Sequence, residues 1–122
     1  MSKILVVDDS VIVRDRVAGF VRRNGLDVDT AVDGKDGLAR LKASPGIRLV
    51  ISDVNMPNMD GITFVRELKT RPAYKFTPVL MLTTESQEDK KEQGKAAGAR
   101  AWMVKPFKPE ALLAAGQKLT LS

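Results

Sequence analysis

Residues 4–9 read Ile4-Leu5-Val6-Val7-Asp8-Asp9, a short apolar run that ends in two aspartates. Residues 49–53 read Leu49-Val50-Ile51-Ser52-Asp53 and repeat the pattern with one aspartate. Short apolar runs rich in β-branched residues are typical of strands that are buried on both faces, as in parallel sheets. The two stretches therefore predict neighbouring parallel strands with carboxylates at their C-terminal ends.

The C-terminal ends of parallel strands share one edge of the sheet, and open α/β sheets bind their ligands at that edge. Asp8, Asp9 and Asp53 are therefore expected to lie close together. Three crowded carboxylates repel one another, so one or more would stay protonated unless a cation lies between them. Oxygen ligands with retained waters suit Mg²⁺, and we expect a magnesium site here.

The composition favours a single globular domain. The chain has 122 residues, of which 43% are apolar, and we expect one domain over residues 1–122 with no output domain. No run is long enough to span a membrane, and there is no signal-peptide pattern. Cysteine and histidine are absent, which excludes disulfides, zinc sites built on either residue, and a histidine base. These features favour a cytoplasmic protein without membrane attachment.

Charge bears on the choice of partners. The net charge is +5. The densest basic positions are Arg14, Arg16, Arg22, Arg23, Lys90, Lys91 and Lys95. Acidic residues interleave with them at Asp15, Asp89 and Glu92, as on a solvated helix face. Neither Trp102 nor Tyr74 lies in a basic run, so we expect no nucleic-acid binding and keep it as an alternative.

Strand-like runs alternate with helix-like stretches along the chain. Strands are expected over residues 3–8, 28–32, 48–53, 78–83 and 99–104. Helices are expected over residues 11–24, 35–43 and 86–97, after Asp60, and from Pro109 onward. Five strands that alternate with five helices predict an α/β fold, a doubly wound parallel sheet with helices on both faces.

Local signals predict where helices begin and end. Ser10 and Asp60 are expected N-caps, because a short oxygen-bearing side chain can accept a hydrogen bond from the first turn. Gly25 stands where a left-handed residue ends a helix. The helix over residues 86–97, which Ser86 would cap, has almost no apolar face. It is either a moving, partner-binding element or an ordinary solvated helix.

Four motifs stand at the predicted strand ends. They are Val6-Val7-Asp8-Asp9-Ser10, Asp53-Val54-Asn55-Met56-Pro57-Asn58-Met59-Asp60-Gly61, Leu82-Thr83-Thr84-Glu85 and Val104-Lys105-Pro106-Phe107. Together they resemble the receiver domain of bacterial response regulators, and most of all its single-domain chemotaxis (CheY-like) type. The resemblance covers essentially the whole chain and implies a flavodoxin-like sheet with the strand order 2-1-3-4-5.

The resemblance implies a role for each motif, and the residue chemistry fits it. Asp53 would be the nucleophile that accepts a phosphoryl group from a histidine kinase as an acyl phosphate. Lys105 would supply a cation, and Thr83 a hydroxyl, to the phosphoryl oxygens. Mg²⁺ would be the cofactor that neutralises charge during transfer. Its ligands would be Asp8, Asp9, Asp53 and the Asn55 backbone carbonyl.

Two further pairs carry regulation by the same resemblance. Thr83 and Trp102 match the threonine and aromatic positions that change conformation after phosphorylation, although chemotaxis regulators usually have tyrosine in place of Trp102. Asn55 and Glu85 match positions that modulate the hydrolytic water, and this pair resembles the fast-clearing chemotaxis type. The phosphoryl group is therefore expected to last seconds to minutes.

Each residue also has a simpler interpretation. Asp8 and Asp9 are compatible with strand-end caps. Thr83 is compatible with an ordinary strand residue and Lys105 with a surface lysine. Trp102 is compatible with a half-buried anchor that never moves. The complete set of motifs in order favours the phosphorylation site over these interpretations.

The function that the sequence favours is a diffusible, phosphorylation-dependent switch, a phosphoacceptor and not an enzyme that acts on other molecules. The expected partners are a histidine kinase of the chemotaxis type, a flagellar motor switch protein or another protein target, and a phosphatase, with the protein itself a monomer. A phosphorelay intermediate or phosphate sink is an alternative. An aspartyl-nucleophile phosphatase is an alternative of another class, but it needs an acid/base aspartate where Asn55 stands.

Overall fold

The computed structural model describes residues 3–44, 46–83, 88–105 and 107–121. In these residues five parallel strands form one sheet in the order β2-β1-β3-β4-β5, which confirms the expected topology. The strands are β1 (Lys3–Val7), β2 (Asp27–Ala31), β3 (Ile47–Asp53), β4 (Val79–Thr83) and β5 (Ala101–Val104). β1 and β3 pair directly, so the aspartates that end these stretches meet at one edge of the sheet.

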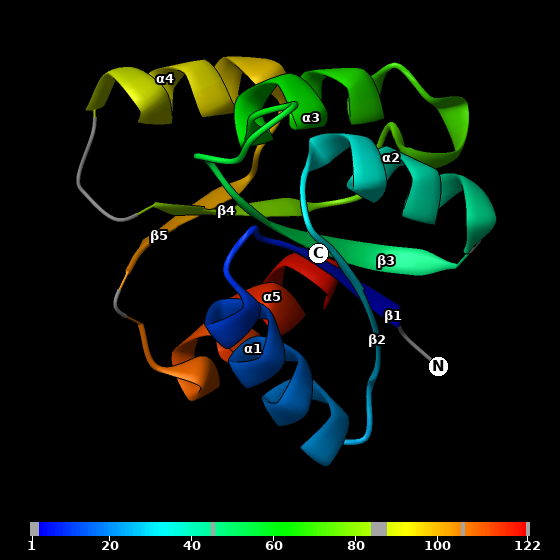
Figure 1. The fold of residues 1–122 in the computed structure, drawn as a ribbon, viewed down its shortest axis with the longest axis vertical. Helices are drawn as coiled ribbons and strands as arrows, with labels where there is room; N and C mark the ends of the chain where they lie inside the picture. The colour runs from blue at the N-terminus through cyan, green and yellow to red at the C-terminus, as the bar shows by residue number, and fades with distance from the viewer. Residues whose placement is uncertain (1–2, 45, 84–87, 106, 122) are drawn as a thin grey trace.

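Helices cover both faces of the sheet (Figure 1). They are α1 (Val11–Arg23), α2 (Gly34–Ala43), α3 (Gly61–Lys69), α4 (Glu88–Ala97) and α5 (Pro109–Leu121), with a short 3-10 helix, η1 (Pro72–Tyr74), before β4. Figure 1 shows α2, α3 and α4 on one face and α1 with α5 on the other. Among the helices of the described ranges, none has the length and apolar character needed to cross a membrane.

The sheet separates two hydrophobic cores. Side chains of a strand alternate between its faces, so Leu5 and Val7 of β1 enter the core under α2 and α3, whereas Ile4 and Val6 enter the core under α1 and α5. All four side chains are buried. Burial on both faces explains why the central strands carry continuous apolar runs, such as Ile4 to Val7 and Val79 to Leu82, instead of alternating with polar residues.

The expected helix ends are largely confirmed. The Ser10 hydroxyl accepts a hydrogen bond from the backbone N–H of Val13 at 3.3 Å, and Gly25 has the expected positive φ of 80°. The expected cap at Ser86 lies outside the described residues. β5 starts at Ala101, two residues later than predicted, because the N–H of Ala99 bonds to the Gly94 carbonyl at 2.9 Å and closes the end of α4.

Phe64 is a core residue that the periodicity did not assign. Ile62, Val65 and Leu68 recur at helical spacing along one face of α3, and all three are buried. Phe64 is also fully buried, because α2 and α4 flank α3 and cover its sides as well as its inner face. Its ring lies against Gly37 of α2, where a Cβ atom would be 2.8 Å from the ring.

Gly61 is the position at which the fold tolerates a side chain least. A Cβ atom there would overlap the backbone carbonyl oxygen of Asp53, while the Gly61 N–H donates to the Val54 carbonyl at 2.8 Å. We expect Gly61→Ala to lower the free energy of unfolding by about 1–3 kcal/mol, since backbone must move to relieve the overlap. Urea denaturation followed by circular dichroism measures the change.

Gly19 in α1 supplies a matched control. A Cβ atom there would meet only the end of the Arg23 side chain, at 3.6 Å. Because alanine is the better helix former, Gly19→Ala should raise the free energy of unfolding by roughly 0.5–1 kcal/mol. Equal effects of the two substitutions would contradict the close approach at Gly61.

Candidate functional site

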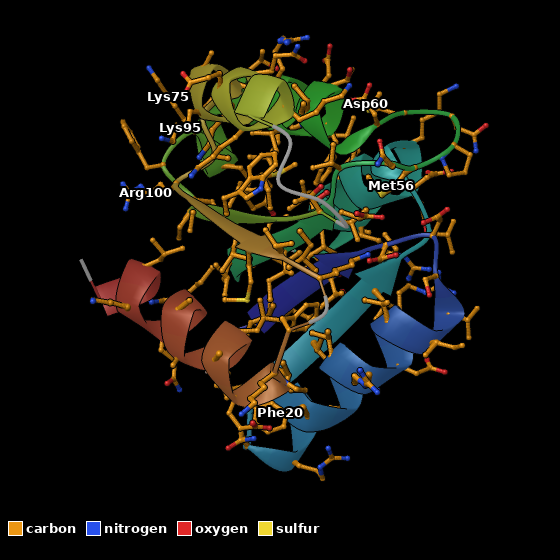
Figure 2. The ribbon with its side chains drawn as sticks, turned by 90° about the vertical axis from the view of Figure 1, so that its left-hand side faces the viewer. Phe20, Met56, Asp60, Lys75, Lys95 and Arg100 are labelled. Carbon is orange, nitrogen blue, oxygen red and sulfur yellow. The ribbon has the colours of Figure 1, made fainter. Side chains whose placement is uncertain are left out.

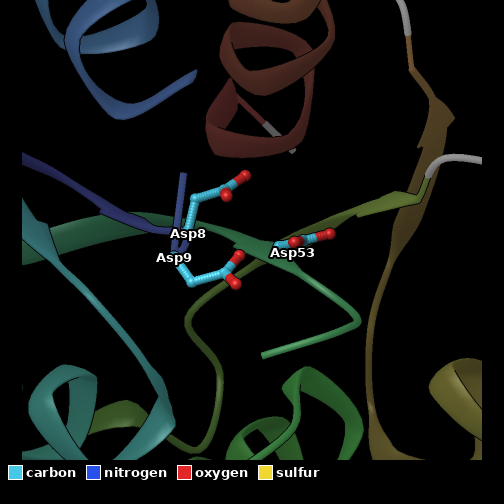
Figure 3. Close-up of side chains that lie close together, drawn as sticks. All are labelled: Asp8, Asp9 and Asp53. Carbon is cyan, nitrogen blue, oxygen red and sulfur yellow. The ribbon is translucent and has the colours of Figure 1, made fainter. Parts of the chain in front are cut away.

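Three carboxylates meet where β1 and β3 end. Val7 of β1 pairs in register with Ser52 of β3, so Asp8 and Asp53 leave neighbouring strands at the same level. One oxygen from each of Asp8, Asp9 and Asp53 lies within 4.8 Å of the others (Figure 3). The parallel sheet thus brings together the aspartates that the sequence analysis singled out, although Asp9 is exposed and the other two are buried.

Asp8 is held on every side. Its Oδ2 accepts a hydrogen bond from the Lys105 ammonium at 2.9 Å, and its Oδ1 accepts one from the Ser10 backbone N–H at 2.9 Å. The guanidinium of Arg14 donates to its backbone carbonyl at 2.7 Å. The Asp8 side chain has no exposed surface, so the two donors to its carboxylate, Lys105 and the Ser10 N–H, replace the water that it loses.

Lys105 links the end of β5 to this cluster. Its Nζ atom lies 3.5 Å from Oδ1 of Asp53 in addition to its bond with Asp8, and its backbone N–H donates to the carbonyl of Thr83. Burial opposes the charge of the ammonium. The hydrogen bond to Asp8 and the negative charges of Asp53 and Asp8 outweigh burial and raise the pKa of Lys105.

The surroundings of Asp53 oppose the ionisation of its carboxyl group. Burial, and then the charge of Asp8, raise the pKa of its carboxyl to about 6, while Lys105 and the backbone N–H of Val54, at 2.9 Å, oppose the rise. At neutral pH Asp53 is therefore largely ionised, but at a cost. A bound cation, or a covalent bond formed by the carboxylate oxygen, removes the unfavourable interactions of this buried negative charge.

The donor set fits a hard divalent cation. Three carboxylates face one ammonium, so the cluster carries excess negative charge when Asp53 is ionised. Carboxylate oxygens are the ligands that Mg²⁺ takes in proteins, usually with several retained waters. The exposure of Asp9 leaves a side on which water has access.

Three of the remaining predicted residues lie on β4, on β5 and in the loop after β3. Thr83 ends β4, fully buried, one strand beyond Asp53. Asn55 lies in the loop after β3, and it is exposed. Glu85 lies outside the described residues. Trp102 lies in β5, where it pairs with Met81 of β4, and is partly buried.

Trp102 packs directly on α4. A Cβ atom at Gly94 of that helix would lie 2.7 Å from Cζ3 of the indole. The ring therefore occupies the space that a side chain would take on any other residue at this helix position. Any change in the position of Trp102 acts on α4 through this contact.

Arg14 is the site residue that the sequence analysis interpreted wrongly. Its place among interleaved charges suggested a solvated helix face, yet its guanidinium holds the Asp8 carbonyl. The usable signal was its spacing, since Arg14 follows the N-cap Ser10 by one helical turn and so returns to the start of α1.

Comparison with known proteins gives matches over nearly the whole chain. The model of the response regulator receiver domain matches residues 4–117. Protein PilG of Pseudomonas aeruginosa is 35% identical over 93% of this chain and 83% of its own length. Chemotaxis protein CheY of Treponema pallidum is 37% identical over 86% of this chain and 73% of its own. The structure of Vibrio cholerae chemotaxis protein CheY4 superposes with a TM-score of 0.93 at 47% identity and covers 98% of each chain.

The charge of Asp53 should make the fold less stable as the pH rises. Because its pKa is about 6 in the folded protein and 3.8 ordinarily, the folded state keeps a proton that the unfolded chain has already lost. In EDTA, wild type should therefore lose up to about 3 kcal/mol of unfolding free energy relative to Asp53→Asn between about pH 4 and pH 6. Urea denaturation across that window measures the difference.

Asp27→Asn is the matched control, since Asp27 is exposed at the opposite edge of the sheet. It should follow wild type at every pH. A constant difference between wild type and Asp53→Asn across the window would contradict the raised pKa.

Proposed function

Because the chain belongs to the response regulator receiver domain family, we propose that it is a phosphorylation-activated switch of a two-component system. The observation that carries the proposal is the buried Asp53 carboxylate between Asp8 and Lys105. Asp53 is ionised near neutral pH, lies at the ligand-binding edge of the sheet, and has a cation 3.5 Å away for the incoming negative charge. These are the requirements of a carboxylate nucleophile in phosphoryl transfer.

The chemistry at Asp53 is a single displacement. An oxygen of its carboxylate forms the new bond to phosphorus while the N–P bond of a phosphohistidine donor breaks, and the electron pair of that bond stays on the imidazole. The chain has no histidine, so the donor is another protein, a histidine kinase. The Lys105 ammonium stabilises the Asp53 carboxylate before the transfer and the phosphoryl oxygens after it. Thr83 donates a hydrogen bond from its hydroxyl to one of these oxygens.

Mg²⁺ is the cofactor that this donor set suits. Asp8, Asp9, Asp53 and the backbone carbonyl of Asn55 would hold the ion, which when bound supplies positive charge to the transferring phosphoryl group. Asp8 is already oriented by Ser10 and Lys105, so it needs no rearrangement to act as a ligand. Asp9 is exposed and completes the site from the solvent side.

Thr83 and Trp102 transmit the phosphorylation of Asp53 to the protein surface by changing conformation. Thr83 ends β4 next to Asp53, and Trp102 lies in the adjacent β5 with its ring against Gly94 of α4. A phosphoryl group on Asp53 that accepts a hydrogen bond from the Thr83 hydroxyl favours the conformation in which Thr83 and Trp102 take their active positions. The surface formed by α4, β5 and α5 then binds a protein target in the cytoplasm.

A chemotaxis output is the specific form of this proposal. The donor would be a chemotaxis kinase and the target a flagellar motor switch protein or a similar complex, because two of the relatives are named as chemotaxis proteins. A phosphorelay intermediate or phosphate sink differs in the fate of the phosphoryl group, which would pass rapidly from Asp53 to a histidine of another protein. Transfer and target binding are therefore the two outcomes to compare.

Incubation with acetyl phosphate and Mg²⁺ should add one phosphoryl group, detected by intact-mass spectrometry. Asp53→Asn should add none because it lacks the nucleophile, and EDTA should abolish the adduct in wild type. Asp27→Asn, an exposed aspartate away from the cluster, should behave as wild type. The proposal fails if wild type gives no adduct with either acetyl phosphate or a purified histidine kinase.

The same experiment gives the lifetime of the adduct after the donor is removed. Asn55 and Glu85 resemble the fast-clearing type, so we expect decay in seconds to minutes. Persistence for hours in Mg²⁺ would instead support a slow relay.

Trp102 is the only tryptophan of the chain, so its fluorescence reports directly on the proposed switch. Phosphorylation should change the emission of wild type. Trp102→Ala should leave the Asp53 adduct intact but weaken target binding at least about tenfold, since the ring links β5 to α4. Gly94→Ala, which displaces the ring, should change the emission before phosphorylation. Unchanged emission on phosphorylation, with unchanged target binding by Trp102→Ala, would refute the switching role.

A further inference from the structure

The loop over residues 54–60, which follows Asp53, is fastened to the start of α2. Nδ2 of Asn58 donates a hydrogen bond to Oδ2 of Asp33 at 2.7 Å. Next to it, the backbone N–H of Gly34 donates to the carbonyl of Met59 at 3.3 Å. Figure 2 shows Met56 and Asp60 on this loop, beside α2. Side chain and backbone thus join the two segments at adjacent points.

Asp33 is a rigid acceptor for the loop. It is 7% exposed, and its second oxygen, Oδ1, caps α2 by accepting from the backbone N–H of Asp36 at 2.8 Å. The carboxylate of Asp36 in turn accepts from the N–H of Val32 at 3.0 Å. The hydrogen bonds from Asp36 and Asn58 lower the pKa of Asp33, so the acceptor stays ionised. Both of its oxygens are occupied, which fixes the carboxylate in one orientation.

Asn58 adopts a backbone conformation that suits this contact. Its φ is 67°, the only positive value at a non-glycine among the described residues. Asparagine tolerates the left-handed region better than most side chains, but at a cost that the surroundings must offset. The bond to Asp33 is the compensating contact that the structure offers.

Gly34 allows the loop to come this close. A Cβ atom there would lie 2.7 Å from Cγ of Met59 and 2.9 Å from its carbonyl oxygen. The loop is also held at its two ends. The N–H of Val54 donates to the carbonyl of Leu82 at 3.0 Å, and the N–H of Gly61 donates to the carbonyl of Val54 at 2.8 Å. The segment between these anchors includes Asn55, and its contacts with α2 are those of Asn58 and Met59.

We propose that Asp33 and Asn58 are positioning residues for the cation site: by holding the loop after Asp53 in one conformation, they would fix the place of the Asn55 backbone carbonyl before the ion binds. This inference rests on the proposed function, which makes that carbonyl a Mg²⁺ ligand. A carbonyl that is held in place before the ion arrives binds it without the entropic cost of ordering the loop. Residues that orient metal ligands commonly alter metal affinity by about tenfold or more when they are replaced.

Asn58→Gly tests the role, since glycine adopts the positive φ readily and removes the side chain that donates to Asp33. Isothermal titration calorimetry should show a Kd for Mg²⁺ roughly tenfold weaker than in wild type. In EDTA, amide hydrogen exchange at Gly34 should be faster, since its bond to Met59 depends on the seated loop. Asn24→Gly, which removes a side-chain bond to Phe20 at the far end of α1, is the control and should change neither quantity.

The exchanged pair Asp33→Asn with Asn58→Asp supplies the rescue. Asparagine at 33 still caps α2 and can donate to aspartate at 58, so the double variant should bind Mg²⁺ within about threefold of wild type and better than Asn58→Asp alone. A general loss of stability would not be repaired in this selective way.

The outcomes separate this inference from the function on which it rests. Wild-type Mg²⁺ affinity in Asn58→Gly, or a double variant as weak as Asn58→Asp alone, would overturn the positioning role and leave the proposed function standing. If wild type bound no Mg²⁺, the proposed function and the positioning role would both be overturned, and faster Gly34 exchange would then report only a structural contact.

Discussion

The buried ion pair between Lys105 and Asp8 is the contact on which the site depends. The two residues follow β5 and β1, and β3 and β4 lie between those strands in the sheet. To reach Asp8, the lysine passes the end of β3, which is why its ammonium also lies 3.5 Å from Asp53. One cation therefore joins opposite parts of the sheet edge and offsets part of the repulsion among three carboxylates.

That compensation is incomplete, because a single ammonium faces three carboxylates. Asp8 has the shorter contact with Lys105 and also accepts the N–H of Ser10, whereas Asp53 shares the ammonium at a longer distance. Burial, and then the charge of Asp8, therefore raise the pKa of Asp53 to about 6 against the opposing effect of Lys105. A buried carboxylate in this condition gains from a bound cation or from esterification, both of which remove the penalty. The ionised form of Asp53 therefore lowers the stability of the fold at the position where the proposed chemistry occurs.

Positive charge elsewhere on the molecule is separated from this cluster. Figure 2 shows Lys75, Lys95 and Arg100 together on one side of the protein, near the ends of β4 and β5 where the chain enters the sheet. The Nζ atom of Lys69, whose pKa is lowered by burial and by Arg100, donates there to the carbonyl of Thr77.

The sequence by itself determined the elements and the kind of site. Apolar runs ending in Asp8 and Asp53 predicted buried parallel strands. The C-terminal ends of parallel strands lie at the same edge of the sheet, independently of how the helices pack. Tertiary structure decided the contacts between distant segments: Lys105 with Asp8, 97 residues apart, and Asn58 with Asp33, 25 residues apart. Periodicity reports only which face of an element is buried, so it could not assign Phe64, whose burial depends on two flanking helices. The pairing of polar groups depends on how separate elements approach one another, and close approaches such as those at Gly34 and Gly61 exist only once the elements have packed.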